Sequence, residues 1–394
     1  MASSISLTVD QHMVKRRQFI VSGLGTIAAL NKRFASDPLE IQVERRGGKI
    51  PLVHITDLYH PPQDPDDHID LATVVALEEF DLRGVILDCT QKFLDAAPAG
   101  FDIRRDPGYV PVLQLAHILG RPIPVAVGPF SPLSSPTDTA ADRPLAEQGG
   151  ITLLLKILEE SDVPVVLSLV GSARVLTAAF NRNPGLVRSK TRRVLLNAGS
   201  TSGPKREWNV GLDPAATIGL WNFGLPIDWY PCATERSAFN PDHERGTYWK
   251  TTHAVLFRAL SPALRSWFQY AFTGSTRGDC IRALEEDVEP VVWEKILLET
   301  RNLWTTASLI MAAGRVLCRS FAGWRFLPRQ DAEGCELWPF SLEPIVASVN
   351  AEAEVQWHLA EGESNIRLFK RRRGAEYGEA MGEALGALLA SLRT

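Results

Sequence analysis

Apolar and polar positions between about Lys49 and Cys232 follow two alternating patterns. Short apolar runs rich in β-branched residues, typical of buried strands, alternate with longer stretches of helical spacing, and turn residues separate the two. Apolar strands joined by helical crossovers form parallel sheets covered on both faces. The sequence therefore predicts an α/β protein with a mostly parallel central sheet covered by helices on both faces. The expected strands are 50–56, 82–88, 123–128, 164–170, 193–198 and 226–232, and the expected helices are 68–80, 109–119, 151–160, 172–181 and 213–223.

The pattern changes beyond about residue 246, where helical spacing and aromatic residues dominate. We expect one large α/β domain at 37–345 and a C-terminal helical extension at 346–394 that packs on the same domain, preceded by a leader at 1–36. The helices expected in this half are 247–260, 292–314 and 375–392, and an edge hairpin is expected at 328–342.

The composition is that of an ordinary globular protein. Of the 394 residues, 45% are apolar and 22% are charged, which excludes a largely disordered or fibrous chain. The net charge of −4 gives no reason to expect a nucleic acid partner. Five widely spaced cysteines include no CxxC pair, so buried free thiols are expected rather than a disulfide framework or a zinc site. The oligomeric state stays open, a homo-oligomer included.

The N-terminus carries a candidate export signal. Arg16 and Arg17 directly precede an apolar run at 19–30, which resembles the twin-arginine signal that carries folded bacterial proteins across the membrane. The run is about 12 residues, too short to span a bilayer of about 30 Å, so no stable membrane span is expected. Lys32 and Arg33 stand where small residues would mark a cleavage site. We expect export to the periplasm; without it the protein would be cytoplasmic.

Five aspartates follow the first expected strand within 14 residues, at 57, 64, 66, 67 and 70. In an open parallel sheet, ligands bind outside the carboxyl ends of the strands. Carboxylates gathered there repel one another by several kcal/mol, even at an effective dielectric constant of about 20, unless a cation or shared protons compensate. Hard oxygen ligands on a proline-stiffened loop suit Ca²⁺ or Mg²⁺ better than zinc.

A simpler interpretation of these aspartates is helix capping. An aspartate near a helix start accepts hydrogen bonds from free amides and meets the positive end of the helix dipole. Any one of the five could do only that, and Asp66 is the best candidate for a residue that points to solvent. His68 is compatible with a plain position in the first helical turn.

A second segment, Glu207-Trp208-Asn209 followed by Asp213-Pro214 and two alanines, gives the acidic loop a family context. Together they resemble the inosine/uridine-preferring nucleoside hydrolase family, whose members carry an Asp-x-Asp-Pro-x-x-Asp-Asp loop and later Glu-Phe-Asn and Asp-Pro-Glu-Ala-Ala. Other matching segments keep the family's order over roughly residues 48–320. They are 163–181, 193–203 and 224–227.

The resemblance implies a Ca²⁺-dependent hydrolase of a ribonucleoside or related N-riboside. The ion would hold the 2′ and 3′ hydroxyls of the sugar and one water, and Asp64 matches the aspartate that acts as base on that water. A backbone carbonyl near 172–174 would complete part of the metal shell. The implied metal ligands are Asp57, Asp64, Asp67 and Asp70, and the implied substrate-binding residues are Asn197, Glu207, Trp208 and Asn209.

Residues in this second segment also have a purely structural interpretation. Glu207 and Asn209 could cap a loop that leads into the next helix. Asp213 is better explained as the N-cap of that helix than as a ligand, because Pro214 follows at the first helical position.

The chain departs from the family pattern in three places. Its acidic loop is longer, so the register of the ligands is uncertain by a residue or more. The family's Thr-Asn pair is replaced near Arg174, whose cation would lie close to the proposed metal. The C-terminal Asp-His pair is missing from the best local match at 301–307, where Thr305 or Thr306 could offer a neutral oxygen. A separate Asp-His dipeptide at 242–243 comes too early in the chain and is better explained as a solvated loop.

Aromatic residues near the carboxyl edge of the sheet could frame a base, although tryptophans are more often part of a core. The candidates are Tyr59, Trp208, Trp229, Tyr230 and Trp249.

The sequence leaves three hypotheses for the function. The first is the metal-activated hydrolase of an N-riboside, the second is a catalytically impaired nucleoside- or sugar-binding protein on the same scaffold, and the third is a hydrolase of a different substrate, since a fold fixes neither sugar nor leaving group.

Overall fold

A computed structural model describes residues 48–62, 65–90, 108–202, 207–235 and 237–392. The predicted leader and Asp64 therefore lie outside the described residues. All described residues fall within one unit, 41–394. In the described part of the chain, no helix is both long enough and apolar enough to cross a bilayer.

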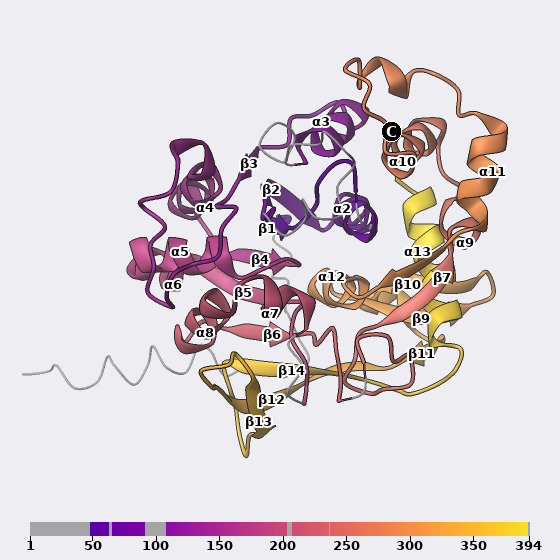
Figure 1. Ribbon diagram of the computed structural model, residues 1–394. Helices are drawn as coiled ribbons and strands as arrows, with labels where there is room; N and C mark the ends of the chain where they lie inside the picture. Colours follow the sequence, from indigo (N-terminus) through magenta and orange to yellow (C-terminus); the bar gives the residue numbers. More distant parts are fainter. Residues whose placement is uncertain (1–47, 63–64, 91–107, 203–206, 236, 393–394) are drawn as a thin grey trace, which may run out of the picture. The chain divides into compact units, whose positions relative to one another are not determined.

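A sheet of nine strands forms the centre of the described structure (Figure 1), in the order β13-β12-β14-β6-β5-β4-β1-β2-β3. The strands from β3 to β14 are parallel, whereas β12 pairs antiparallel with β14 and β13 pairs antiparallel with β12. The predicted fold class is confirmed. The bounds are β1 (Ile50–Thr56), β2 (Phe80–Leu87), β3 (Val125–Val127), β4 (Val165–Leu169), β5 (Thr191–Leu196), β6 (Ile227–Trp229), β12 (Phe340–Val349), β13 (Val355–Leu359) and β14 (Ile366–Arg371).

Two apolar cores lie on the two faces of this sheet. Along β1, which is buried throughout, Ile50 and Leu52 belong to one core and Val53 and Ile55 to the other. This alternation puts successive side chains on opposite faces and explains why β1 is apolar at nearly every position. One core contains residues of α4 (Gly149–Glu160), α5 (Arg174–Arg182), α6 (Pro184–Lys190) and α8 (Pro214–Asn222); the other contains residues of α2 (Asp66–Ala76), α3 (Tyr109–Ile118), α10 (Pro262–Phe272), α12 (Thr306–Ala312) and α13 (Tyr377–Ala390).

The helix expected at 247–260 is wrong in its first half, and the helix expected at 292–314 is wrong in its middle. The first segment forms β7 (Trp249–Thr252) and then α9 (His253–Phe257); the second forms α11 (Pro290–Leu298), β8 (Thr300–Leu303) and α12. The reason is the antiparallel pairing of β7 with β8, a contact between distant segments that local periodicity does not encode.

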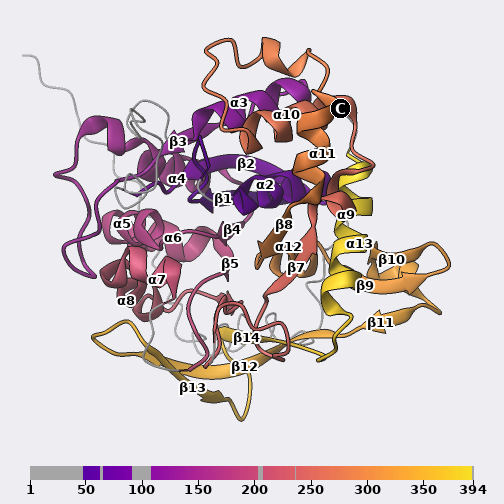
Figure 2. The same ribbon diagram turned by 45° about the vertical axis from the view of Figure 1, so that its right-hand side comes forward.

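The C-terminal extension also differs from its expected helical form. Strand β12 crosses the expected boundary at residue 345, and β13 and β14 join the central sheet, so only α13 is helical beyond that point. Gly382 and Gly386 let α13 approach its neighbours closely, because a Cβ at Gly386 would lie 2.3 Å from the Val255 carbonyl oxygen. Figure 2 shows α13 beside α9 and the small sheet β10-β9-β11. That sheet comprises β9 (Arg315–Ser320), β10 (Gly323–Pro328) and β11 (Glu336–Trp338).

The strand order reverses between β1 and β4, the neighbouring strands at the centre of the parallel part. From β1 the chain moves outward through β2 and β3, and from β4 it moves the other way through β5 and β6. The crevice at such a reversal, beyond the carboxyl ends of the strands, is where open α/β sheets bind ligands. Asp57 follows β1 at this point, and Asn197 follows β5.

Candidate functional site

A cavity of about 460 Å³ opens at these strand ends. Its size falls within the range of pockets that hold small molecules in proteins. Segments that follow β1, β4, β5 and β6 meet here with the start of α2, the short helix α7 (Trp208–Leu212) and the start of α12. The lining residues are Asp57, Tyr59, Asp66, Asp67, Asp70, Val170, Asn197, Glu207, Trp208, Asn209, Cys232, Ala238, Phe239, Trp304 and Thr305.

Asp57, Asp67 and Asp70 form one side of this cavity, which we call the acid wall. Asp57 follows β1, while Asp67 and Asp70 are three residues apart on α2 and so share one helix face. Thr56 Oγ1 donates a hydrogen bond of 2.8 Å to Asp67 Oδ1. The side chains of Asp57 and Asp67 are close enough for each to shift the pKa of the other.

Burial is the main cause that raises the pKa of each acid-wall residue. The pKa of Asp57 and that of Asp67 lie well above their usual value, because burial is reinforced by the negative charges of neighbouring aspartates. Burial raises the pKa of Asp70 to about 7, although a hydrogen bond with Thr305 lowers it. Asp70 Oδ1 is buried and has no hydrogen-bond partner among the described residues. The acid wall thus gathers carboxyl groups whose negative charge no neighbouring cation balances in the described part of the chain.

The donor set of the acid wall fits a hard divalent cation. It consists of carboxylate oxygens, supplemented by the Thr305 hydroxyl, and the buried Asp70 oxygen lacks a partner. Among the described residues, however, no three or more His, Cys, Asp or Glu side chains are already gathered as a metal-binding group. Asp64, which the family resemblance makes the base and a ligand, lies outside the described residues.

Asp88 is a fully buried carboxylate beside the acid wall that the sequence analysis did not identify. Burial raises its pKa to about 7, while Arg174 and Ser172 lower it. Gly171 permits this proximity, because a Cβ there would lie 3.0 Å from Asp88 Oδ2 and 3.1 Å from the Asp57 nitrogen. The sequence feature that could have identified Asp88 is its position directly after β2, which matches the position of Asp57 directly after β1.

Arg174 and Asp213 form a separate, fully buried ion pair, with 3.0 Å between Arg174 Nε and Asp213 Oδ2. Arg174 also donates to the Pro129 carbonyl oxygen at 2.6 Å. Asp213 accepts a 2.9 Å hydrogen bond from the Ala216 amide and caps α8, which confirms its predicted role as an N-cap. The cation that the sequence placed near the metal is thus neutralised by Asp213, and Arg174 does not line the cavity.

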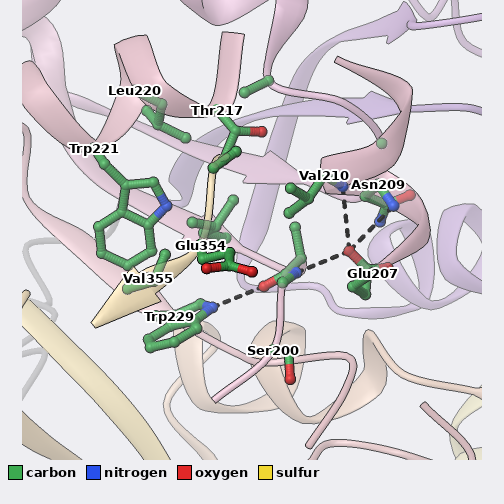
Figure 3. Close-up of a pocket in the computed structure, with 16 residues that line it drawn as sticks. Ser200, Glu207, Asn209, Val210, Thr217, Leu220, Trp221, Trp229, Glu354 and Val355 are labelled. Atoms are coloured by element: carbon green, nitrogen blue, oxygen red, sulfur yellow. Dashed lines mark hydrogen bonds between the residues drawn. The ribbon is translucent and has the colours of Figure 1, made fainter. Parts of the chain in front are cut away.

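Asn197, Glu207 and Asn209 also line the cavity, and we call them the amide wall. Glu207 Oε2 accepts hydrogen bonds from the amides of Gly199 at 2.8 Å and Asn209 at 3.1 Å, and it caps α7 (Figure 3). Asn209 Nδ2 donates to the Asn197 carbonyl oxygen at 3.0 Å. Asn197 Oδ1 is buried and has no partner within the part of the chain that the structure describes. The structure therefore brings the three predicted sugar-binding residues together, and Glu207 also has the capping role of the simpler interpretation.

A second, smaller pocket of about 30 Å³ lies behind Glu207, which lines both spaces. Figure 3 shows Glu354, Trp221 and Trp229 around it. This volume holds little more than a water molecule. The larger cavity is therefore the one that admits a substrate.

Of the five aromatic residues that the sequence offered, two line the cavity and three do not. Tyr59 and Trp208 line the cavity, and Trp208 is 45% exposed. The other three predicted residues, Trp229, Tyr230 and Trp249, are fully buried, because their strands lie between packed layers.

Phe239 and Trp304 line the cavity instead, with ring centroids 5.6 Å apart, and Trp304 Nε1 donates to the Ala238 carbonyl oxygen at 2.9 Å. Tyr248 packs against both rings. The aromatic side of the cavity is thus built from segments that meet only through the pairing of β7 with β8.

The C-terminal half contributes Thr305 to the cavity, next to Asp70. Thr306 Oγ1 is buried without a partner. His243 does not line the cavity; it faces Glu235, with 3.3 Å between His243 Nε2 and Glu235 Oε2. The Asp-His dipeptide at 242–243 therefore does not fill the place of the family's C-terminal pair in this structure.

No family model matches the chain. The pyrimidine-specific ribonucleoside hydrolase RihA of Enterobacter sp. (strain 638) is 30% identical over 182 residues, which are 41% of this chain and 55% of that relative. The match thus spans about half of the relative's length. It agrees with the resemblance to nucleoside hydrolases that the order of the motifs indicates.

Two solved structures are similar at low identity. An inosine-uridine preferring nucleoside hydrolase from Bacillus anthracis is 12% identical, with 87% of this chain and 100% of that chain covered and a TM-score of 0.46. A purine-preferring ribonucleoside hydrolase from Gardnerella vaginalis is 12% identical, with 86% and 99% covered and a TM-score of 0.47.

Proposed function

We propose that this chain hydrolyses the N-glycosidic bond of a ribonucleoside or related N-riboside and uses Ca²⁺ to do so. The observation that carries the proposal is one cavity lined by both the acid wall and the amide wall. The first offers carboxylate oxygens that lack a counter-charge, and the second offers amide and carboxylate groups suited to sugar hydroxyls. The relation to a ribonucleoside hydrolase supports the same reaction class.

The acid wall would hold the metal. Carboxyl groups in contact are stable only with shared protons or a cation, and Ca²⁺ accepts six to eight oxygen ligands in flexible geometry. Asp57, Asp67 and Asp70 would be ligands, and Asp64 would join them by the family resemblance. When bound, such an ion lowers the pKa of a coordinated water and polarises the oxygens of a substrate.

The protein side chains have three tasks in this reaction. Asp64 would accept the proton of the attacking water, for which a carboxylate near a cation stays ionised at neutral pH. Asn197, Glu207 and Asn209 would hold the ribose hydroxyls and so fix the sugar for attack. As the C–N bond breaks, positive charge develops on the sugar, and nearby carboxylates stabilise it.

The leaving base would lie against the aromatic side of the cavity. Phe239, Trp304 and Trp208 present ring surface there, which suits a flat heterocycle. Thr305 is the hydroxyl that the C-terminal half places at the cavity. The identity of the base is open within this proposal.

The test measures release of reducing sugar from inosine and uridine by the purified full chain, with Ca²⁺ and with a chelator. We expect Ca²⁺-dependent turnover that Asp67→Asn and Asp64→Ala each remove. Asp162→Asn is the matched control, because Asp162 is an exposed aspartate just before β4, at the opposite end of the strands. It should behave as the wild type.

Two other outcomes would point elsewhere. Binding of a nucleoside without any turnover would favour the impaired binding protein and contradict the proposal. Turnover of another glycoside, with none of inosine or uridine, would mean that the protein is a hydrolase of a different substrate.

Export through the Arg16–Arg17 leader is a separate proposal. It is tested by recovering the protein from a bacterial periplasm and sequencing its N-terminus, with an Arg16→Lys, Arg17→Lys variant as the control. Retention of the wild-type chain in the cytoplasm would contradict it.

A further inference from the structure

Two cysteines that are distant in sequence meet on the small sheet β10-β9-β11. In the antiparallel pairing of β9 with β11, Cys318 lies opposite Leu337, and Arg319 lies opposite Glu336. Cys335 directly precedes β11 and is two residues from Leu337, so the pleat puts it on the same sheet face as Cys318. Cys335 is close enough for its thiol to act on that of Cys318.

The pair differs from the other three cysteines. Cys89 and Cys232 are buried, and Cys280 is partly exposed. Cys335 is among the groups that act on the Cys318 thiol, whereas the groups that act on Cys232 are carboxylates. Cys318 itself is fully buried, whereas Cys335 is partly exposed and open to a reagent in solution.

We propose that Cys318 and Cys335 are a redox-active pair that a small disulfide such as oxidised glutathione converts to an internal disulfide. The Cys335 thiolate attacks one sulfur of oxidised glutathione, which releases one reduced glutathione and leaves a mixed disulfide. Cys318 then loses its proton to solvent and attacks the Cys335 sulfur, and the second glutathione leaves. The two protein thiols are oxidised, and one glutathione disulfide is reduced to two thiols.

Exposure decides the order of these steps. Burial and the neighbouring thiol raise the pKa of Cys318 to about 11, so little of it is thiolate at neutral pH. Cys335 therefore reacts first, and the contact with Cys318 makes the second attack intramolecular. We expect the mixed disulfide to form and then to resolve slowly.

The bond would link the middle of β9 to the residue that precedes β11, and β10 would lie within the closed loop. A disulfide stabilises a protein mainly because it restricts the unfolded chain. Strand β9 follows α12, whose preceding residue Thr305 lines the cavity. The melting temperature of the oxidised protein should therefore be several degrees higher than that of the reduced one. The bond should also restrict motion of the sheet β10-β9-β11.

The experiment incubates the full chain with oxidised glutathione, blocks remaining thiols with an alkylating reagent, and maps the peptides without reduction. We expect Cys318 and Cys335 in one linked peptide pair, with the mass lowered by two hydrogens. Cys280 is the internal control: it is partly exposed, so we expect it to keep a glutathione adduct. Cys280→Ser should leave the internal disulfide unchanged.

Two variants make the result decisive. In Cys318→Ser, the glutathione adduct on Cys335 should persist, and in Cys335→Ser no linked peptide should form and Cys318 should resist modification. A persistent adduct on Cys335 in the wild type would overturn the proposal. So would a melting temperature that oxidation does not raise, measured on the Cys280→Ser protein so that this thiol does not contribute.

Discussion

Two groups of buried aspartates in this protein meet opposite conditions. Asp213 and Asp228 are fully buried and paired: Asp213 with Arg174, and Asp228 with Arg367, whose Nε and Nη2 each lie 2.7 Å from a carboxylate oxygen. The acid wall is largely buried too, with Asp57 8% and Asp70 3% exposed and Asp67 partly buried, but its neighbours are mainly other acids. Burial alone therefore does not mark a functional carboxylate. What distinguishes the acid wall is that, in the described part of the chain, no cation is among the groups that shift its pKa values.

The paired group should respond to mutation mainly through stability. Removing one partner of a buried ion pair leaves an uncompensated charge and costs about 3–5 kcal/mol. We expect Arg174→Met to lower the free energy of unfolding by that amount in chemical denaturation. Arg277→Met is the control, because Arg277 forms an exposed ion pair with Asp279 and should show no change that the measurement resolves. Equal effects of the two variants would contradict the distinction.

The acid wall should respond in the opposite way. Asp67→Asn removes one negative charge and one ligand, so we expect Ca²⁺ affinity and turnover to fall by about 100-fold or more. In a chelator, the same variant should be as stable as the wild type or more stable, by about 1 kcal/mol, because repulsion is relieved. Calcium titration calorimetry and denaturation in chelator measure the two halves. A loss of stability in chelator would show that Asp67 supports the fold instead.

The pH dependence of stability sharpens the comparison at Asp70. Its pKa in the folded chain is about 7, against 3.8 as the ordinary value, so between these pH values the folded state binds the extra proton. In chelator, wild-type stability from this group rises as pH falls from 7 toward 4, by about 1.4 kcal/mol per unit at most. The destabilisation caused by ionising buried Asp70 is absent below pH 3.8 and complete above pH 7.

The measurement compares wild type with Asp70→Asn across that range, because the difference isolates Asp70 from other titrating groups such as His68. We expect the variant to be the more stable protein at pH 7.5 and the difference to shrink toward pH 4. With Ca²⁺ present the order at pH 7.5 should reverse. A difference that does not vary with pH would contradict the assigned cause.

The sequence was sufficient where local patterns determine the structure. Buried strands such as β1 and β4 lie within a residue of their expected bounds. A short, uninterrupted apolar run in an α/β protein is typical of a strand that is buried on both faces. Asp213 could be assigned as a cap because Pro214 follows it. In these places each residue's role depends on its immediate neighbours.

The rest of the site depends on distant contacts. Phe239 and Trp304 reach the cavity through the pairing of β7 with β8, which has no local signature. Asp88 is a single aspartate after a strand and gains meaning only because β2 lies beside β1. The expected helix at 68–80 included Asp70, but α2 begins at Asp66 and so also carries Asp67. The partner that neutralises Arg174 was not predicted.

Glu207 lies between the two groups and should show the smallest and most mixed effect. Burial raises its pKa, but backbone amides lower it, and one of its oxygens caps α7 while its side chain lines the cavity. We expect Glu207→Gln to cost about 1 kcal/mol of stability, as for a weakened N-cap, and to raise KM more than it lowers affinity for Ca²⁺. Calcium titration and substrate kinetics on the same sample separate these effects. If Ca²⁺ affinity fell as far as in Asp67→Asn, Glu207 would belong with the acid wall, and the division between paired and unpaired carboxylates would have to be redrawn around it.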